Sequence, residues 1–540
     1  MKRTKNPAKE AEYRKRATDL VAQMTLHEKV SQMLSWAPAI ERLGIPAYNW
    51  WSEGIHGIGR AGTATVFPQA IGMAAAFDED MMEQVGNAVG VEARGKYNMC
   101  RAHGDRDIFK GLTVWAPNIN IFRDPRWGRG HETYGEDPFL TGRLGVRFVE
   151  GMQGDDPDYL QAAACAKHFA VHSGPESDRH HFNAIVSKQD LWETYLPAFR
   201  ALVKEAGVEA VMGAYNRTNG EPCCGSKTLL KDILRDKWHF DGHVTSDCWA
   251  IKDFHTGHMV TDGPVESVAL AVNNGCDLNC GDLYVYLEQA VAEGKLSEEK
   301  IDESLTRLYV TRMRLGMFDA EDQVPYNKVG YDVVDSAEMK ALNLKVADSI
   351  MTLLKNDGTL PLDKSKLHTV GVIGPNADNR KALLGNYEGT ASRYTTVLEG
   401  IEDYLGDDVK VRYSQGCHLY ADNIHGLAES NELMSEVKGV CEESDVVIAV
   451  LGLDSGLEGD KGNQFASGDK PNLKLPGHQE EVLKACVESG KPVVLVLLGG
   501  SALAVNYADE HANAILEAWY PGARGGEAVA RALFGETNPQ

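Results

Sequence analysis

Several apolar runs in the first part of the chain end in polar side chains that could do chemistry. The segment GHVTSDCWAIKDF places Asp247 directly after such a run, and Trp249 follows two residues later. A carboxylate there can be held in a cleft, and the indole offers an aromatic wall suited to a sugar face. An aspartate after a strand is also a common N-cap of the next helix. This segment alone therefore leaves a catalytic and a structural role open.

Two further segments concentrate charge after predicted strands. NINIFRDPRWGRGHETYGEDP surrounds Trp127 with charged side chains, which indicates an ion-pair network that fixes loops, a set of sugar-binding donors, or both. Its charged residues are Arg123, Asp124, Arg126, Arg129, Glu132, Glu136 and Asp137. AKHFAVHSGPESDRHHF carries Lys167, His168, Arg179, His180 and His181. Lys167 beside His168 offers two donors to vicinal hydroxyls, and the histidine spacing does not fit a metal site.

Tryptophans and an acid come together in YNWWSEGIHG. Glu53 and His56 follow Trp50 and Trp51, as a sugar platform with a hydroxyl acceptor would require. Two core tryptophans followed by a surface glutamate would give the same pattern, so both interpretations stay open.

A glycine-rich acidic loop follows an apolar run in the second half of the chain. VVIAVLGLDSGLEGDKGN contains Asp454, Glu458 and Asp460. A phosphate-binding loop is excluded because neither GxGxxG nor GxxxxGK[ST] is present and three carboxylates would repel phosphate. A carboxylate on a loop of a second domain is what a two-carboxylate glycosidase needs, since one group attacks the anomeric carbon and the other protonates the leaving oxygen.

The elements that must position these residues alternate between strand-like and helix-like patterns. Five runs end at Asn120, His172, Asn216, Asp247 and Asn279, which predicts parallel strands whose carboxyl ends form one active-site face. We predict a (β/α)8 TIM-like barrel over residues 1–318 and a linker over 319–337. Residues 338–540 should form an α/β sandwich with a mostly parallel sheet, built from HTVGVIG, VKVRYS, DVVIAVLG, PVVLVLLGG and AILEAW. Because the chain stops after a helix-like segment, we expect this second domain to be incomplete at its C-terminus.

The charge composition indicates which kinds of partner the chain can bind. The 540 residues include 78 acidic and 55 basic ones, for a net charge of −23, which disfavours nucleic acid and anionic membranes but not a neutral sugar. The basic, polar N-terminus contains no apolar run of a secretory signal, so the chain is expected to be cytoplasmic, although a trimmed signal would leave the same sequence. The ten cysteines are expected to be mostly reduced, with one of Cys223 and Cys224 facing solvent.

The motifs together resemble glycoside hydrolase family 3 over nearly the whole chain. RDPRWGR (123–129), AKHF (166–169), the SD of VTSDCWAI and SIMTLLKNDGTLPL (349–362) match its signature segments in order, as do ATVFPQAIGMAA and EAWYPGARGGEAVARALFG. The resemblance implies a barrel followed by a sandwich, an active site at their interface, no cofactor or metal, and Asp247 as nucleophile. It also implies sugar contacts from Glu53, Arg126, Lys167, His168 and Arg179, with Tyr215 close to the nucleophile.

The acid/base and the substrate follow less directly from the resemblance. LEGD around Glu458 looks like the LEGE or IEAE segments of the xylosidase-like branch, so we predict Glu458, rather than Asp460, as acid/base. The segment AKHFAVHSGPESDRHH lacks the KHFPGHG pattern of the branch that acts on N-acetylglucosamine, which argues against that activity. Glu53 slightly favours xylose over glucose, so an exo-acting retaining β-xylosidase is predicted, with a β-glucosidase or a catalytically impaired carbohydrate-binding relative as alternatives.

The resemblance also bears on the end of the chain. Family members usually continue past GETNP, so a truncated or split protein is expected, which a homodimer or a separate C-terminal fragment would complete.

Overall fold

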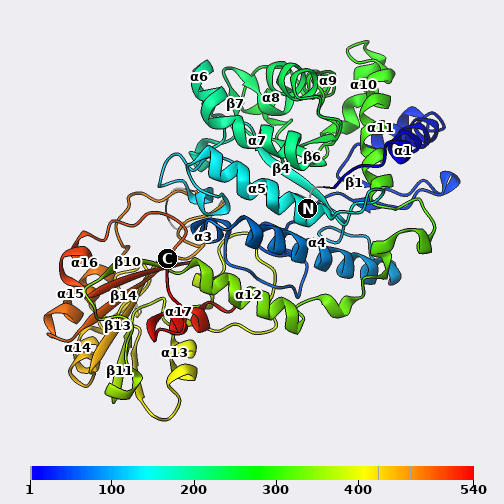
Figure 1. Cartoon of the computed structure of the whole chain (residues 1–540). Coiled ribbons are helices and arrows are strands. Elements are labelled where there is room, and N and C mark those ends of the chain that lie inside the picture. The colour runs from blue at the N-terminus through cyan, green and yellow to red at the C-terminus, as the bar shows by residue number, and fades with distance from the viewer. Residues whose placement is uncertain (1–2, 424, 461–464, 466) are drawn as a thin grey trace. The chain divides into compact units, whose positions relative to one another are not determined.

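The computed structural model describes residues 3–423, 425–460, 465 and 467–540, and the chain divides into two compact units. The first unit contains Met1–Ala64, Asp78–Phe122 and Thr133–Ser336 (Figure 1). The second contains Thr65–Phe77, Arg123–Glu132 and Ala337–Gln540. Among the described residues, no helix is long and apolar enough to cross a membrane.

The first unit is built around a barrel-like ring of strands. β3 (Thr113–Val114), β4 (Ala163–Phe169), β6 (Ala210–Gly213) and β9 (His243–Ser246) pair in parallel in that order. Single parallel bridges extend the ring, and they join Ser52 to Val114, Thr245 to Leu278, and Leu34 to Asn279. β1 (Trp36–Ala37) and β2 (Tyr48–Asn49) complete it as an antiparallel pair, which the purely parallel predicted barrel does not contain.

Helices cover this ring, and their ends follow ordinary capping rules. α4 (Glu79–Ala102) starts at Asp78, whose side chain accepts a hydrogen bond from the Met81 N–H at 2.9 Å. α5 (Pro138–Gln153) packs closely on α4, since a Cβ on Gly86 would lie 2.2 Å from the Phe148 carbonyl oxygen. Other α-helices of this unit are α1 (Pro7–Val21), α2 (Leu26–Gln32), α9 (Pro264–Asn274), α10 (Leu287–Ala292) and α11 (Glu298–Arg314).

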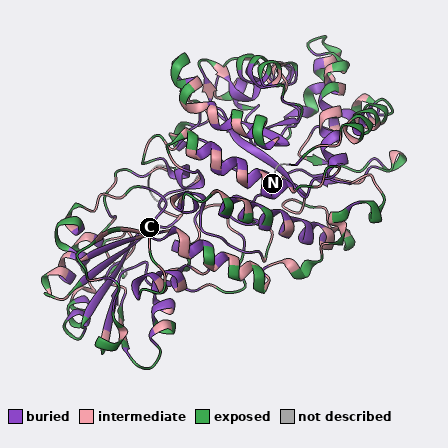
Figure 2. Ribbon diagram, in the orientation of Figure 1, coloured by how far each residue is buried: buried purple, intermediate pink, exposed green. Residues whose placement is uncertain are grey.

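The second unit contains a six-stranded sheet in the order β10-β15-β14-β13-β11-β12. The five predicted strands are confirmed as β11 (Thr369–Ile373), β12 (Lys410–Ser414), β13 (Val446–Gly452), β14 (Val493–Leu498) and β15 (Ala514–Trp519), all parallel. The unpredicted β10 (Thr352–Asn356) pairs antiparallel with β15, and the backbone of Gln540 bonds to Met351 and Leu353 beside it. Every residue of β13 and β14 is buried, as expected for strands covered on both faces (Figure 2).

The helices of the second unit form two groups. α12 (Ala337–Ile350) and α13 (Val397–Leu405) both contact α17 (Gly525–Leu533). α14 (Met434–Glu442) contacts α15 (Gln479–Glu488), which in turn contacts α16 (Asn506–His511). Apolar side chains from α14, α15, β13, β14 and β15 share one core cluster.

Two segments that precede the predicted boundary belong to the second unit. The 65–77 segment contains α3 (Ala70–Ala75), and Gln69 N–H donates to the Tyr520 carbonyl at 2.9 Å. The Asn343 side chain donates to the Val66 carbonyl at 2.9 Å. The second unit is therefore discontinuous in sequence, whereas the predicted domains 1–318 and 338–540 are continuous stretches.

We predict that His243 makes the stability of the first unit depend on pH. Its ring is fully buried against Trp50, and its Nδ1 lies 2.9 Å from Thr311 Oγ1. Burial lowers the pKa of His243 to about 4, so the unfolded chain binds the proton more readily between that value and about 6.5. Unfolding free energy should therefore fall as the pH drops from 6.5 to 4, by up to roughly 3 kcal/mol from this residue.

The check is thermal melting of wild type and His243→Asn across this pH range. Asparagine retains a hydrogen-bonding group near Thr311 but does not titrate, so its melting temperature should fall less steeply with acid. Parallel pH dependences in the two proteins would contradict the assignment.

Candidate active site

Asp247 lies directly after β9, at the carboxyl end of the strand. Its side chain is 11% exposed, and its Oδ1 accepts a hydrogen bond from the Cys248 N–H at 2.8 Å. Its Oδ2 lies 3.7 Å from His168 Nε2. The carboxylate is thus held from one side and faced by a basic group on the other, which is an arrangement suited to a nucleophile.

His168 is oriented by Asn120, which follows β3. Asn120 Oδ1 accepts from the His168 N–H at 2.8 Å and lies 2.9 Å from His168 Nδ1, while Asn120 Nδ2 donates to the His168 carbonyl at 2.8 Å. Because the amide oxygen faces Nδ1, that nitrogen carries a proton and donates it. Nε2 is left to face Asp247, so His168 becomes a donor there only as the imidazolium.

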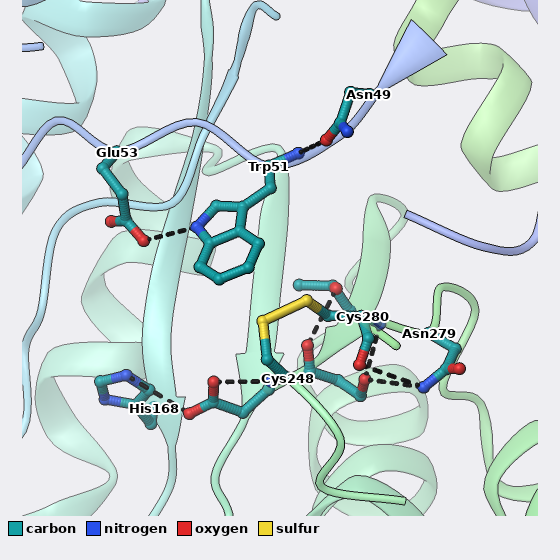
Figure 3. The surroundings of a disulfide bond; sticks show 10 residues. Asn49, Trp51, Glu53, His168, Cys248, Asn279 and Cys280 are labelled. Carbon is teal, nitrogen blue, oxygen red and sulfur yellow. Dashed lines mark hydrogen bonds and ion pairs between the residues drawn. A yellow bond between two sulfur atoms is a disulfide. The ribbon is translucent and has the colours of Figure 1, made fainter. Parts of the chain in front are cut away.

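Glu53 and Lys167 form a buried ion pair. Lys167 Nζ lies 3.2 Å from Glu53 Oε2, and the two side chains are only 2% and 3% exposed. The indole N–H of Trp51 donates to Glu53 Oε1 at 2.8 Å (Figure 3). Trp51 itself stacks on Trp115 with ring centroids 5.6 Å apart. Glu53 is therefore an oriented acceptor beside an aromatic platform.

Trp50 does not lie beside Glu53 as Trp51 does. It is 1% exposed and packs edge-on against His243, so it belongs to the core. Of the two predicted platform tryptophans, the structure leaves only Trp51 next to Glu53.

A chain of contacts leads from His168 to the next predicted sugar-binding residues. The His168 and His172 rings lie 5.3 Å apart, and His172 Nε2 lies 3.4 Å from Glu176 Oε1. Arg179 pairs with Glu176 at 2.9 Å and lies over the Tyr215 ring at 4.5 Å. Arg179 and Tyr215 thus contact each other and are connected to the Asp247 region through buried side chains.

A disulfide joins the two strand ends beside the nucleophile. Cys248 follows Asp247, Cys280 follows Asn279, and the two are bonded (Figure 3). The Trp249 N–H donates to the Cys280 carbonyl at 2.7 Å. Trp249 as a residue is 52% exposed, and its backbone φ is 61°. The bond was not predicted, although two cysteines directly after the polar ends of neighbouring strands were a usable signal.

The other eight cysteines are free and buried. Cys223 and Cys224 are both fully buried, so the expectation that one of them faces solvent was wrong. Among the described residues, no group of three or more His, Cys, Asp or Glu side chains is arranged to hold a metal ion.

The second unit contains the other predicted site residues, and Glu458 is fully buried in it. Glu458 Oε1 accepts from the Gly500 N–H at 2.6 Å and from the Tyr520 hydroxyl at 2.7 Å, and Oε2 accepts from the Ser501 hydroxyl. Both oxygens of Glu458 are thereby occupied by donors from the ends of β14 and β15. This carboxylate fastens its loop to the sheet.

Asp460, two residues further, has a different environment. It is partly exposed, and its Oδ2 accepts from the Tyr387 hydroxyl at 3.1 Å. Tyr387 in turn lies 3.4 Å from Arg129, whose guanidinium forms a buried bidentate pair with Glu132. Arg129 thus donates hydrogen bonds within this buried network.

Arg126, in the same segment, has a side chain that is 55% exposed and pairs with Asp124 at 2.7 Å.

The first unit holds a carboxylate at a strand end of its barrel, flanked by buried cationic, acidic and aromatic side chains. The second unit adds an α/β sheet with carboxylates on a loop. These features together define a two-domain glycoside hydrolase. Models of the family match both parts of the chain: "Glycosyl hydrolase family 3 N terminal domain" covers residues 16–311, and "Glycosyl hydrolase family 3 C-terminal domain" covers 351–540. The chain belongs to glycosyl hydrolase family 3.

Relatives of known sequence are similar over almost the whole chain. "Probable beta-D-xylosidase 7" of Arabidopsis thaliana is 39% identical over 97% of this chain and 69% of its own length. "Xylan 1,4-beta-xylosidase" of Xylanibacter ruminicola is 34% identical over 97% of this chain and 78% of its own.

Solved structures agree on the fold. A GH3 exo-beta-xylosidase in complex with a xylobiose aziridine activity-based probe has a TM-score of 0.90 and 32% identity, covering 97% of this chain and 67% of that one. The beta-glucosidase of Listeria innocua in complex with glucose has a TM-score of 0.82 and 28% identity. The match covers 97% of this chain and 75% of that one.

We predict that the oxidised protein has eight titratable thiols among its ten cysteines. Unfolding it in denaturant without reductant should expose eight, and prior reduction should raise the number to ten, because only Cys248 and Cys280 are bonded. A Cys248→Ser/Cys280→Ser double variant should give eight under both conditions. Ten thiols in the unreduced wild type would contradict the disulfide.

Proposed function

We propose that this protein removes terminal, non-reducing β-linked xylose from oligosaccharides by a retaining, double-displacement mechanism. The observation that carries the proposal is the position of Asp247, held at a strand end by the Cys248 N–H and faced by His168 Nε2. The names of the relatives, which are xylosidases at 34% and 39% identity, support the same activity.

In the first step, Asp247 attacks the anomeric carbon and forms a covalent glycosyl-enzyme, while an acid protonates the leaving oxygen. In the second step, the residue that acted as acid, now a base, takes a proton from a water molecule. The water oxygen bonds to the anomeric carbon and the bond from that carbon to Asp247 breaks, which releases the sugar and frees Asp247. Glu53 and Lys167 supply a fixed acceptor and a fixed donor for sugar hydroxyls, since their ion pair holds both side chains in place. Arg179, Tyr215, Trp249 and Arg126 complete the proposed set of sugar contacts.

The hydrogen bonding of Glu458 leads us to transfer the acid/base role from Glu458 to Asp460. A group that protonates a leaving oxygen must reach the substrate, but Glu458 is fully buried and engaged by Gly500, Ser501 and Tyr520. Asp460 is partly exposed, and its Oδ2 accepts a hydrogen bond from the Tyr387 hydroxyl at 3.1 Å. Glu458 then becomes a positioning residue, which fixes the loop that carries Asp460.

Glu53 supports xylose as the preferred sugar. Its carboxylate is one methylene longer than aspartate and is fixed by Trp51 and Lys167, so it crowds the space that a C6 hydroxymethyl group would need. Such a difference is worth about 1–3 kcal/mol, which leaves room for activity on β-glucosides as well.

The disulfide favours a location different from the cytoplasm that the N-terminus suggested. Disulfides persist mainly in oxidising compartments, and Cys248–Cys280 lies beside the proposed nucleophile. We therefore propose that the protein functions in an oxidising environment.

We predict that Asp247→Ala lowers kcat on p-nitrophenyl β-xyloside by on the order of 10⁴-fold, because no glycosyl-enzyme can form. Asp262→Ala, an exposed aspartate of the same unit, is the matched control and should keep full activity. Wild type should hydrolyse the β-xyloside with a higher kcat/KM than the β-glucoside. After reaction with a 2-fluoro-xyloside, mass spectrometry should find the label on Asp247, and a label on another carboxylate would refute the assignment.

We predict different defects for the two second-unit carboxylates. Asp460→Ala should slow substrates with poor leaving groups far more than activated aryl xylosides, and azide should partly restore turnover. Glu458→Gln should lower the melting temperature and reduce activity on all substrates by a similar factor, without azide rescue. Selective loss on poor leaving groups with azide rescue in Glu458→Gln, and not in Asp460→Ala, would return the role to Glu458.

A further inference from the structure

The sheet of the second unit reverses its direction of winding at β11. From β11 the chain passes through α13 to β12 on one side, and then through α14 to β13 on the other side of β11. In open parallel sheets the loops at such a point diverge and leave a crevice at the carboxyl ends of the strands, where ligands bind.

A cavity of about 460 Å³ lies at this point, within the range usual for small-ligand pockets. Its lining comes from the loops after three strands: Pro375 to Lys381 after β11, Gln415 to Tyr420 after β12, and Asp454 to Leu457 after β13. We call it the switch-point pocket. All these residues belong to the second unit.

The polar side chains of the switch-point pocket are held by their own loops. Asn379 Oδ1 accepts from the Lys381 N–H at 3.0 Å, and Asp454 Oδ1 accepts from the Gly456 N–H at 2.7 Å. Asp378 accepts from the Thr396 hydroxyl at 3.1 Å. Each of these carboxylates and amides keeps further hydrogen-bonding capacity in a fixed position. The side-chain amide of the half-buried Gln415 also lines the pocket, with both a donor and an acceptor group.

Aromatic rings complete the lining. Tyr413 is 38% exposed and Tyr420 is half-buried. The His418 ring packs edge-on against Tyr420 at 5.4 Å, and its Nδ1 accepts from the Ala421 N–H at 3.3 Å. The His418 ring proton therefore sits on Nε2, which can donate to a ligand.

The charges of the pocket select against anions. Asp378 and Asp454 line it together with one cation, Lys381, whose Nζ lies 3.8 Å from Asp454. A phosphate or nucleotide would meet two carboxylates, and a purely apolar ligand would leave the amides and carboxylates without partners. Amides, carboxylates and a histidine beside tyrosine rings match a neutral ligand that has hydroxyls and apolar ring faces.

We propose that the switch-point pocket of the second unit is a binding site for a neutral oligosaccharide. Asp378, Asn379, Gln415 and His418 bond its hydroxyls, and Tyr413 and Tyr420 pack against its sugar rings. The lining of the pocket alone supports a neutral sugar as the ligand. Its identification as a β-1,4-linked xylan fragment rests on the proposed function.

The test is calorimetric titration of the full chain with xylotetraose, cellotetraose and inorganic phosphate. Asp247 is first blocked with a 2-fluoro-xyloside, so that remaining binding reports a second site. If no label forms, the titration is made on Asp247→Ala, and binding is then assigned to the pocket only where the pocket variants described below weaken it, which keeps this test independent of the proposed function. We expect the blocked protein to bind at least one tetrasaccharide and not phosphate.

The pocket is located with Gln415→Ala and Tyr420→Ala, which should each weaken this binding by about tenfold or more. Tyr507→Ala, a half-buried tyrosine on α16 away from the pocket, is the matched control and should bind as wild type. Thermal melting verifies that each variant is folded. If Gln415→Ala alone folds, it decides the result.

Three outcomes would overturn the proposal. These are the absence of tetrasaccharide binding in the blocked protein, binding that the pocket variants leave unchanged, and binding of phosphate in preference to sugar. Binding of cellotetraose but not xylotetraose would retain the neutral-sugar site and refute only the xylan assignment.

Discussion

Parallel backbone pairing between β4, β6 and β9 is the constraint on which the candidate site depends, because it fixes which residues emerge at one edge of the barrel. Phe169 pairs with Gly213, and Gly213 pairs with Ser246. Asp247 is the next residue after that register and therefore emerges level with the end of β4. His168, one residue before Phe169, then lies 3.7 Å from Asp247. A shift of one residue in this register would turn each side chain to the opposite face of its strand.

Burying these groups costs desolvation energy, and paired side chains offset part of this cost. Glu53 and Lys167 neutralise each other at 3.2 Å, and the Trp51 N–H occupies the other Glu53 oxygen. Asn120 satisfies the His168 backbone and ring together. Such pairs add little to net stability, but they hold charges and donors where a reacting sugar needs them. The Cys248–Cys280 disulfide links the segment after β9 to the segment after Asn279. The Asn279 amide donates to Ser246 Oγ at 3.4 Å and so connects the same two segments.

The sequence predicted features that repeat along the chain and missed those that depend on a single distant partner. The strand that ends just before Asp247 followed from apolar periodicity, and the five parallel strands of the second unit followed from Val- and Leu-rich runs. The strand predicted to end at Asn120 is shorter than expected, because β3 ends at Val114. The antiparallel β1–β2 pair has two residues per strand, too few to show a period. The burial of Glu458 depends on Gly500, Ser501 and Tyr520, which lie more than 40 residues away, so no local pattern distinguishes it from Asp460.

The discontinuous second unit limits how the gene can be divided. Three separate stretches supply it, and the central one contributes the buried Glu132, whose oxygen accepts a hydrogen bond from the Asn386 amide at 2.8 Å. Gln69 likewise donates to the Asn386 carbonyl at 2.9 Å. A fragment starting at Ala337 would lose both neighbours and leave Asn386 without them. A single recombination crossover would therefore transfer only part of the second unit. Both units stay intact only when the whole chain is inherited together.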